Sequence, residues 1–226
     1  MVWLAALALL LLLVLPPLMA RGEIERHRAP DPALPGTGGE LAWSLLNRAG
    51  VKNVRVELTT GGDHYDPQTK TVRLTEPHYH GASLAAVAVA AHEVAHALQD
   101  HEGYGPLKTR TALVNAAGQI EKIGAALMLV TPVLALATRS PKVGLLSAAA
   151  GLLTMGVMTL THLVTLPVEW DASFRRALPM LREGGYLPPE KLRQARGILR
   201  ACALTYLSGS VMSLLNVGRW ITILRR

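Results

Sequence analysis

Cysteine, aromatic residues and charged residues are all scarce in this chain of 226 residues. It has one cysteine, Cys202, together with 4 Trp, 5 Tyr and 1 Phe, and 17% of its residues are Asp, Glu, Lys or Arg. A single cysteine excludes a small secreted protein held together by disulfides. The charged share is below the roughly one quarter found in soluble domains. Because half of the residues are apolar, a disordered chain is excluded and an ordinary soluble globule is disfavoured.

Four uncharged apolar runs account for most of this excess. An α-helix needs about 20 residues to cross the hydrocarbon core of a bilayer, so we predict about four transmembrane helices. They are an N-terminal anchor (1–20), a hairpin (123–168) and a C-terminal helix (201–226). A cleaved signal peptide is the alternative for the first run, and buried helices of a soluble core for the second and fourth. The runs are Val2–Ala20, Ile123–Thr138, Val143–Val168 and Ala201–Gly218.

Two polar regions separate these runs, at 21–122 and 169–200. In the first region, apolar spacing predicts a helix over 39–49, alternation predicts strands over 51–58 and 69–74, and a long apolar stretch predicts a helix over 83–100. Ser83 is the expected N-cap of that long helix. The predicted fold is therefore mainly α and integral to the membrane, with a small β-hairpin or sheet beside the long helix.

The long predicted helix contains the sequence His92-Glu-Val-Ala-His96. Residues four apart share one helical face, so both imidazoles can bind one metal ion, and Glu93 lies beside the position of a metal-bound water. Zinc lowers the pKa of such a water to about 7 and polarises a peptide carbonyl, while the glutamate transfers the proton. The alternative is a pair of hydrogen-bonded core histidines. The pattern favours a catalytic zinc site with Glu93 as the base.

A catalytic zinc usually has three protein ligands, and Glu169 is the candidate for the third. It follows an apolar run, where an unpaired carboxylate would be costly unless a metal bound it. Asp171 fits the second layer of the site, accepting the free N–H of a ligand histidine, although an N-cap for 172–181 explains it equally well. His162 lies about two helical turns before Glu169. It is a weaker candidate for the same supporting position.

Three stretches of the sequence resemble the neutral zinc metallopeptidases of the YugP type, which are membrane-bound bacterial proteins. A more distant resemblance is to HtpX-like and CAAX-prenyl membrane proteases. The resemblance implies an integral-membrane, zincin-like fold with one catalytic zinc ion held by His92, His96 and Glu169, and with Glu93 as general base. The stretches are His92–Gln99, Asp63–Leu74 and Leu166–Ser173.

The same resemblance implies that the strand containing Thr71–Leu74 pairs with an extended peptide substrate. A purely structural strand explains these residues equally well. The nearby run Asp63-His-Tyr-Asp66 has residue types that can bind metal or stabilise an oxyanion. Turn chemistry alone also accounts for it.

The distribution of basic residues gives an expected orientation. With four spans, regions 21–122 and 169–200 lie on one side of the membrane, and they contain 18 of the 23 Lys and Arg residues. The positive-inside rule then predicts a multi-pass protein of the cell membrane with its catalytic face in the cytoplasm. Because bases and acids are mixed rather than clustered with aromatic residues, we expect no nucleic-acid partner.

The sequence thus predicts a membrane-integrated zinc endopeptidase that cleaves membrane or membrane-proximal polypeptides through a zinc-bound water activated by Glu93. Its expected partners are a polypeptide substrate and the lipid bilayer, and its oligomeric state is open. Two alternatives stand beside it: a zinc hydrolase of a non-peptide bond, and a chaperone-like membrane protein with a structural zinc site. Glu93 argues against the structural site, which needs no base and has a fourth side-chain ligand.

Overall fold

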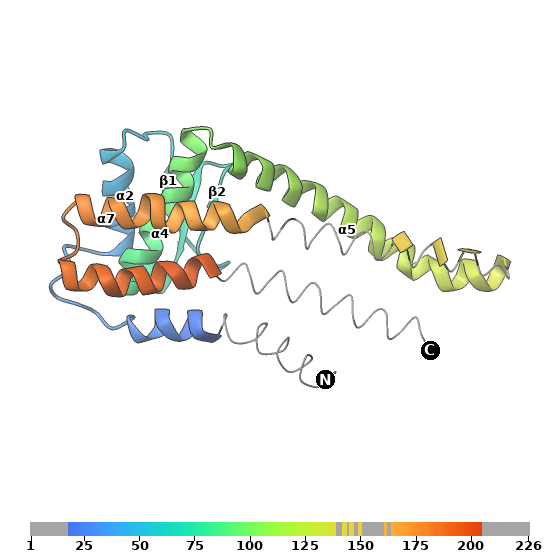
Figure 1. Cartoon of the computed structure of the whole chain (residues 1–226), viewed down its shortest axis with the longest axis horizontal. Helices are drawn as coiled ribbons and strands as arrows, with labels where there is room; N and C mark the ends of the chain where they lie inside the picture. The colour runs from blue at the N-terminus through green and yellow to red at the C-terminus, as the bar shows by residue number, and fades with distance from the viewer. Residues whose placement is uncertain are drawn as a thin grey trace.

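The computed structural model describes residues 18–138, 142–143, 145–146, 149–150, 161 and 164–204. Within them, several helices pack against one small sheet, and one long helix leads away from the body that the other elements form (Figure 1). Residues 18–26 and 189–204 are also helical. The elements in chain order are α2 (Gly38–Arg48), β1 (Arg55–Thr59), β2 (His64–Asp66), β3 (Thr71–Thr75), α3 (Glu76–Tyr79), α4 (Leu84–His101), α5 (Gly105–Thr138), the π-helix η1 (Asp171–Ala177) and α7 (Leu178–Glu183).

The sheet has three strands in the order β1-β3-β2. β3 pairs with β1 in parallel and with β2 in the antiparallel direction. The strand that contains Thr71–Leu74 is therefore central: β1 pairs with it over Thr71–Thr75, and β2 pairs with it over Thr71–Arg73. The expectation that it is an edge strand on which a substrate pairs is wrong, because it lies between two other strands. β2, which sequence patterns did not predict, is an edge strand of the sheet.

Helix α4 is the centre of the body. It spans Leu84–His101, close to the predicted range 83–100, and Ser83 caps it by accepting a hydrogen bond from the Ala86 N–H at 3.1 Å. Side chains are buried on every face of this helix because α2, the sheet and η1 all pack against it. The buried polar side chains of His92, His96 and Gln99 consequently find their partners inside the protein rather than in water.

Helix α2 approaches α4 closely because of a glycine. A Cβ on Gly38 would lie 2.2 Å from the His78 carbonyl oxygen and 2.9 Å from that of Ala86. The N-terminus of α2 has a capping box, in which the Thr37 side chain accepts from the Glu40 N–H and the Glu40 carboxylate accepts from the Thr37 N–H. These contacts fix one wall of the core against α4.

The prediction of an integral-membrane fold with about four transmembrane helices is wrong. Among the described residues, no helix combines the length and the apolar character that crossing a membrane requires. The uncharged run 123–138 is the last part of α5, whose earlier turns carry charges such as Lys108 and Arg110. Its 16 residues rise about 24 Å, short of the roughly 30 Å of a hydrocarbon core.

The predicted orientation of the catalytic face was derived from four spans, so that derivation loses its basis with them. Several predicted features lie outside the described residues. They are most of the N-terminal segment (1–17), most of the third apolar run, His162, and the C-terminal segment 205–226.

Candidate metal centre

Three side chains from two distant parts of the chain meet beside α4. His92 and His96 lie one turn apart on this helix, and Glu169 lies two residues before the first residue of η1. Glu169 Oε2 is 3.1 Å from His92 Nε2 and 3.3 Å from His96 Nε2. All three side chains are buried, and Glu169 is fully so. Within the described part of the chain, this is the one group of at least three His, Cys, Asp or Glu side chains that can hold a metal ion.

The geometry of this group fits zinc. Tetrahedral zinc with ligand bonds of 2.0–2.2 Å separates its ligand atoms by about 3.3 Å, and the two Nε2–Oε2 distances match that separation. The other carboxylate oxygen, Glu169 Oε1, is a buried atom without a hydrogen-bond partner. Its nearest charge is the guanidinium of Arg110 on α5, with Nη2 at 3.6 Å. A fully buried carboxylate is costly unless it is paired or binds a metal, and this one faces two imidazoles and one guanidinium.

Electrostatics separates the two glutamates of the site. Burial raises the pKa of Glu93 to about 7, which exceeds the opposing effect of His92. Burial alone would also raise the pKa of Glu169, but His96 and His92 outweigh it and hold that pKa well below its usual range. Glu169 therefore remains a charged carboxylate. Glu93, which keeps 7% of its surface exposed, is poised to exchange a proton near neutral pH.

Each of the two histidines has a partner at its other ring nitrogen. His96 Nδ1 is 2.9 Å from Gln99 Oε1, and His92 Nδ1 is 3.0 Å from Ser173 Oγ. Sequence reasoning missed Gln99, Ser173 and Arg110 because nothing in the sequence indicates which polar residues face the site. Asp171 lies one hydrogen bond further out than expected: it accepts from Gln99, 2.9 Å away, and not from a histidine.

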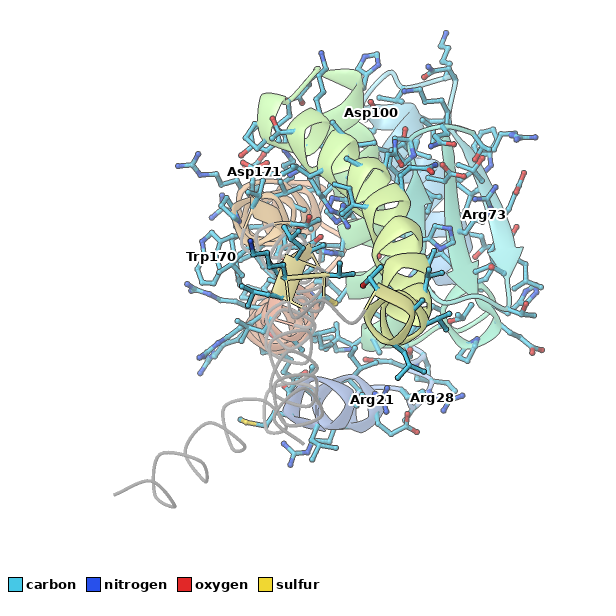
Figure 2. The ribbon with its side chains drawn as sticks, turned by 90° about the vertical axis from the view of Figure 1, so that its right-hand side faces the viewer. Arg21, Arg28, Arg73, Asp100, Trp170 and Asp171 are labelled. Atoms are coloured by element: carbon cyan, nitrogen blue, oxygen red, sulfur yellow. The ribbon has the colours of Figure 1, made fainter. Side chains whose placement is uncertain are left out.

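One short segment supplies several of these groups: Glu169 lies two residues before the π-helix η1, which contains Asp171 and Ser173. The backbone hydrogen bonds of a π-helix join residues five apart. A side-chain hydrogen bond has the same spacing here: the Arg176 Nε–H donates to Asp171 Oδ2 at 2.7 Å. The buried residues Glu169, Ser173 and Ala177 are each four apart, a stripe that would drift by about 40° per step around an α-helix. In Figure 2, Asp171 lies on the side of α5 opposite to Arg73 of β3.

The histidine and aspartate residues upstream of α4 do not join the metal-binding group. The Asp63 carboxylate accepts hydrogen bonds from the Thr75 N–H at 2.7 Å and from His78 Nδ1 at 2.7 Å. Burial would raise the pKa of Asp63, but these partners lower it overall. The pair ties the start of β2 to the end of β3. Asp63 also contributes to the raised pKa of Glu93, so its charge is felt at the site.

Cys202 is also near the site. Burial raises the pKa of its thiol, and the carboxylates of Glu93 and Glu169 raise it further. Cys202 is not part of the group of described side chains that could hold a metal ion.

A cleft of about 170 Å³ adjoins the site. His96 contributes to its wall, so the cleft gives access to one residue of the candidate metal-binding group. One side comes from β2 and the turn after it, and the other from the first turns of α5, including Arg110. The lining residues are Tyr65, Asp66, Pro67, Gln68, His96, Leu107, Arg110, Thr111, Val114 and Asn115.

A buried His-His-Glu group that could hold a metal ion, with a second glutamate beside the first histidine, is the arrangement expected of a zinc metallopeptidase. Comparison with known proteins agrees: the chain belongs to the family described as "Putative neutral zinc metallopeptidase", which matches residues 2–225. It is also similar to the "Putative membrane protease YugP" of Bacillus subtilis (strain 168), with 33% identity over 213 residues, covering 90% of this chain and 87% of the relative. No solved structure matches the chain significantly. The predicted resemblance and the predicted zinc cofactor are confirmed.

Proposed function

We propose that this chain is a zinc metalloendopeptidase in which His92, His96 and Glu169 hold the metal and Glu93 is the catalytic base. The observation that carries the proposal is the convergence of the two imidazole Nε2 atoms on one oxygen of a fully buried carboxylate. A peptidase of this kind needs a base next to the metal as well, and Glu93 directly follows His92 on α4.

The residues of the site have separate roles in the proposed reaction. When bound, zinc lowers the pKa of a coordinated water to about 7 and polarises a carbonyl oxygen. Glu93 accepts a proton from the water that attacks the carbonyl carbon, and later gives it to the leaving amine nitrogen as the C–N bond breaks. Its pKa, raised by burial to about 7, makes the carboxyl group able both to accept this proton and to release it. Glu169 stays ionised and holds its position through the reaction.

The cleft between β2 and α5 is the proposed binding site for the polypeptide. It is lined by an edge strand on one side and by Arg110 and Asn115 on the other. An extended peptide can donate and accept hydrogen bonds along such an edge. Because the cleft opens onto His96, a peptide bound there would carry one of its carbonyl groups to the metal.

The proposed substrates are membrane or membrane-proximal polypeptides. This rests on the name of the relative from Bacillus subtilis, a membrane protease, and on the 50% apolar composition of the sequence. Cleavage of one peptide, offered either free or anchored to vesicles by an acyl chain, tests the substrate class. Faster cleavage of the anchored peptide is expected, and equal rates would contradict this part of the proposal.

The decisive experiment for the peptidase compares the wild type with Glu93→Gln for bound zinc and for cleavage of an unfolded protein. Both should bind one zinc per chain, because Glu93 is not a ligand. The variant should lose at least about 100-fold in cleavage rate, since a positioned general base contributes 10²–10⁴-fold. Glu190→Gln changes an exposed glutamate and serves as the control.

Equal cleavage by the wild type and Glu93→Gln, with equal zinc content, would overturn the mechanism. Zinc binding without cleavage of any polypeptide would instead favour a structural metal or a non-peptide substrate.

A further inference from the structure

The Nδ1 atoms of the two ligand histidines are held by two side chains that nothing in the motif specifies. Ser173 contacts His92 and Gln99 contacts His96, at 3.0 Å and 2.9 Å. Both Ser173 and Gln99 are fully buried. Water therefore does not compete for these bonds, and the direction of each is set by the protein atoms around it.

The direction of the Ser173 bond follows from counting its hydrogens. A serine hydroxyl has one hydrogen, and Ser173 Oγ donates it to the backbone carbonyl of Leu199 at 3.0 Å. Toward His92 the hydroxyl oxygen can then act only as an acceptor, so His92 must carry its hydrogen on Nδ1. The lone pair of the neutral imidazole is consequently on Nε2, the nitrogen that faces Glu169.

The same count applies to Gln99. Its amide nitrogen has two hydrogens and donates both, one to the Val168 carbonyl at 2.9 Å and one to Asp171 Oδ2 at 2.9 Å. Both of these partners are acceptors, so the amide cannot be turned over without losing both bonds. Gln99 Oε1 is left as the acceptor for His96, which must also carry its hydrogen on Nδ1.

We propose that Ser173 and Gln99 are positioning residues that hold both imidazoles in the Nδ1–H form, so that both Nε2 lone pairs face the metal. Asp171 takes part indirectly: its carboxylate, held by the Arg176 Nε–H at 2.7 Å, fixes the orientation of the Gln99 amide. The inference rests on the proposed function, in that it takes His92 and His96 as ligands. It assigns their supporting residues to η1 and to the last turns of α4.

Two variants and two matched controls test the inference. Ser173→Ala removes the acceptor of His92, and Gln99→Met removes that of His96 at nearly constant volume. Thr165→Val is the control for Ser173→Ala, because it also removes a buried hydroxyl. The Thr165 hydroxyl donates its hydrogen bond to the Thr161 carbonyl at 2.7 Å and not to a histidine. Gln194→Met, at an exposed position, is the control for Gln99→Met.

The first readout is the dissociation constant for zinc, measured by competition with a chromophoric chelator. Each of the two variants should bind zinc about 10- to 100-fold more weakly than the wild type, the usual effect of losing a partner of a ligand histidine. Both controls should stay within about twofold. The second readout is the ¹⁵N spectrum of the histidines in the zinc-loaded protein. In the wild type, His92 and His96 should each show a protonated Nδ1, and each variant should change the signal of its own histidine alone.

Zinc binding within twofold of the wild type in folded Ser173→Ala would overturn the inference, as would a protonated Nε2 on either histidine of the wild type. An equal loss of affinity in Thr165→Val would assign the effect to general destabilisation and would also overturn it. If Gln99→Met does not fold, Ser173→Ala, which removes a single oxygen, decides alone. A wild type that binds zinc but cleaves no polypeptide would refute the proposed peptidase while leaving these results standing.

Discussion

Replacing Glu169 by Gln tests the third ligand at nearly constant shape. The carboxylate is fully buried, and its two oxygens have different partners: Oε2 faces the two histidines and Oε1 faces Arg110 at 3.6 Å. The substitution removes the negative charge that faces both the two histidines and Arg110. Breaking a buried charge pair by removing one partner costs about 3–5 kcal/mol. If that cost falls on metal binding, the zinc affinity drops by roughly 10²- to 4 × 10³-fold.

Thermal unfolding with and without zinc measures this loss directly. At a free zinc concentration 100 times its dissociation constant, binding stabilises the wild type by about 2.7 kcal/mol. For a chain of this size, that raises Tm by about 5–10 °C. At the same zinc concentration Glu169→Gln should gain less than about 2 °C, because zinc is then at or below its dissociation constant. The exposed Glu190→Gln should respond as the wild type does.

An undiminished rise of Tm in Glu169→Gln, together with an unchanged zinc affinity by chelator competition, would remove Glu169 from the ligand set. A lower Tm of the zinc-free variant alone would not rescue the assignment. It would show only that Arg110 needs a counter-charge.

Three further predictions concern the framework of the site. Asp63→Asn should lower the free energy of unfolding at pH 7 by about 1.5–3 kcal/mol. Because the pKa of Asp63 is lowered in the folded state, this difference should be present above about pH 4 and should shrink as acid protonates the wild-type carboxylate. Thermal melts of both proteins at pH 7 and pH 3 measure it. Leu74→Ala, in the fully buried centre of β3, should cost about 2–5 kcal/mol in urea unfolding. Thr37→Ala should cost about 0.5–2 kcal/mol through loss of the α2 cap, and an unchanged Tm would contradict that cap.

Some parts of the site could be predicted from the sequence. They follow either from the geometry of one helix or from the free-energy cost of placing a charge in an apolar stretch. Two histidines four apart share a helical face whatever surrounds the helix, and in the structure both approach the same oxygen of Glu169. Glu169 was predicted because a carboxylate in an apolar stretch is expensive without a partner. Neither argument required knowledge of the fold.

The supporting residues could not be predicted, because their roles depend on which helices face one another. Gln99 and Ser173 are ordinary polar residues in the sequence, and only the packing of η1 against α4 joins them to the ligands. β2 has three residues, too few to show an alternating pattern. It forms because Asp63 is bound to Thr75 and because Tyr65 donates a hydrogen bond to Asp100 at 2.6 Å.

The prediction of four transmembrane helices was based on apolar content. Apolar content alone does not distinguish a helix that faces lipid from one that is buried in protein. Helix α4 shows this directly, since its apolar start, residues 84–91, is buried among α2, the sheet and η1. In α5, the uncharged part continues a helix whose first turns carry charges and line the cleft.

X-ray absorption at the zinc edge of the purified protein tests the central claim most directly, because it reports the atoms bound to the metal. The account predicts one zinc per chain with two imidazole nitrogens at about 2.0–2.1 Å and oxygen ligands at about 2.0–2.2 Å. Glu169→Ala should lose an oxygen ligand, and Cys202→Ser should leave the spectrum unchanged. A sulfur ligand at about 2.3 Å, or two imidazoles that persist after both His92 and His96 are replaced, would contradict the assignment of the metal centre.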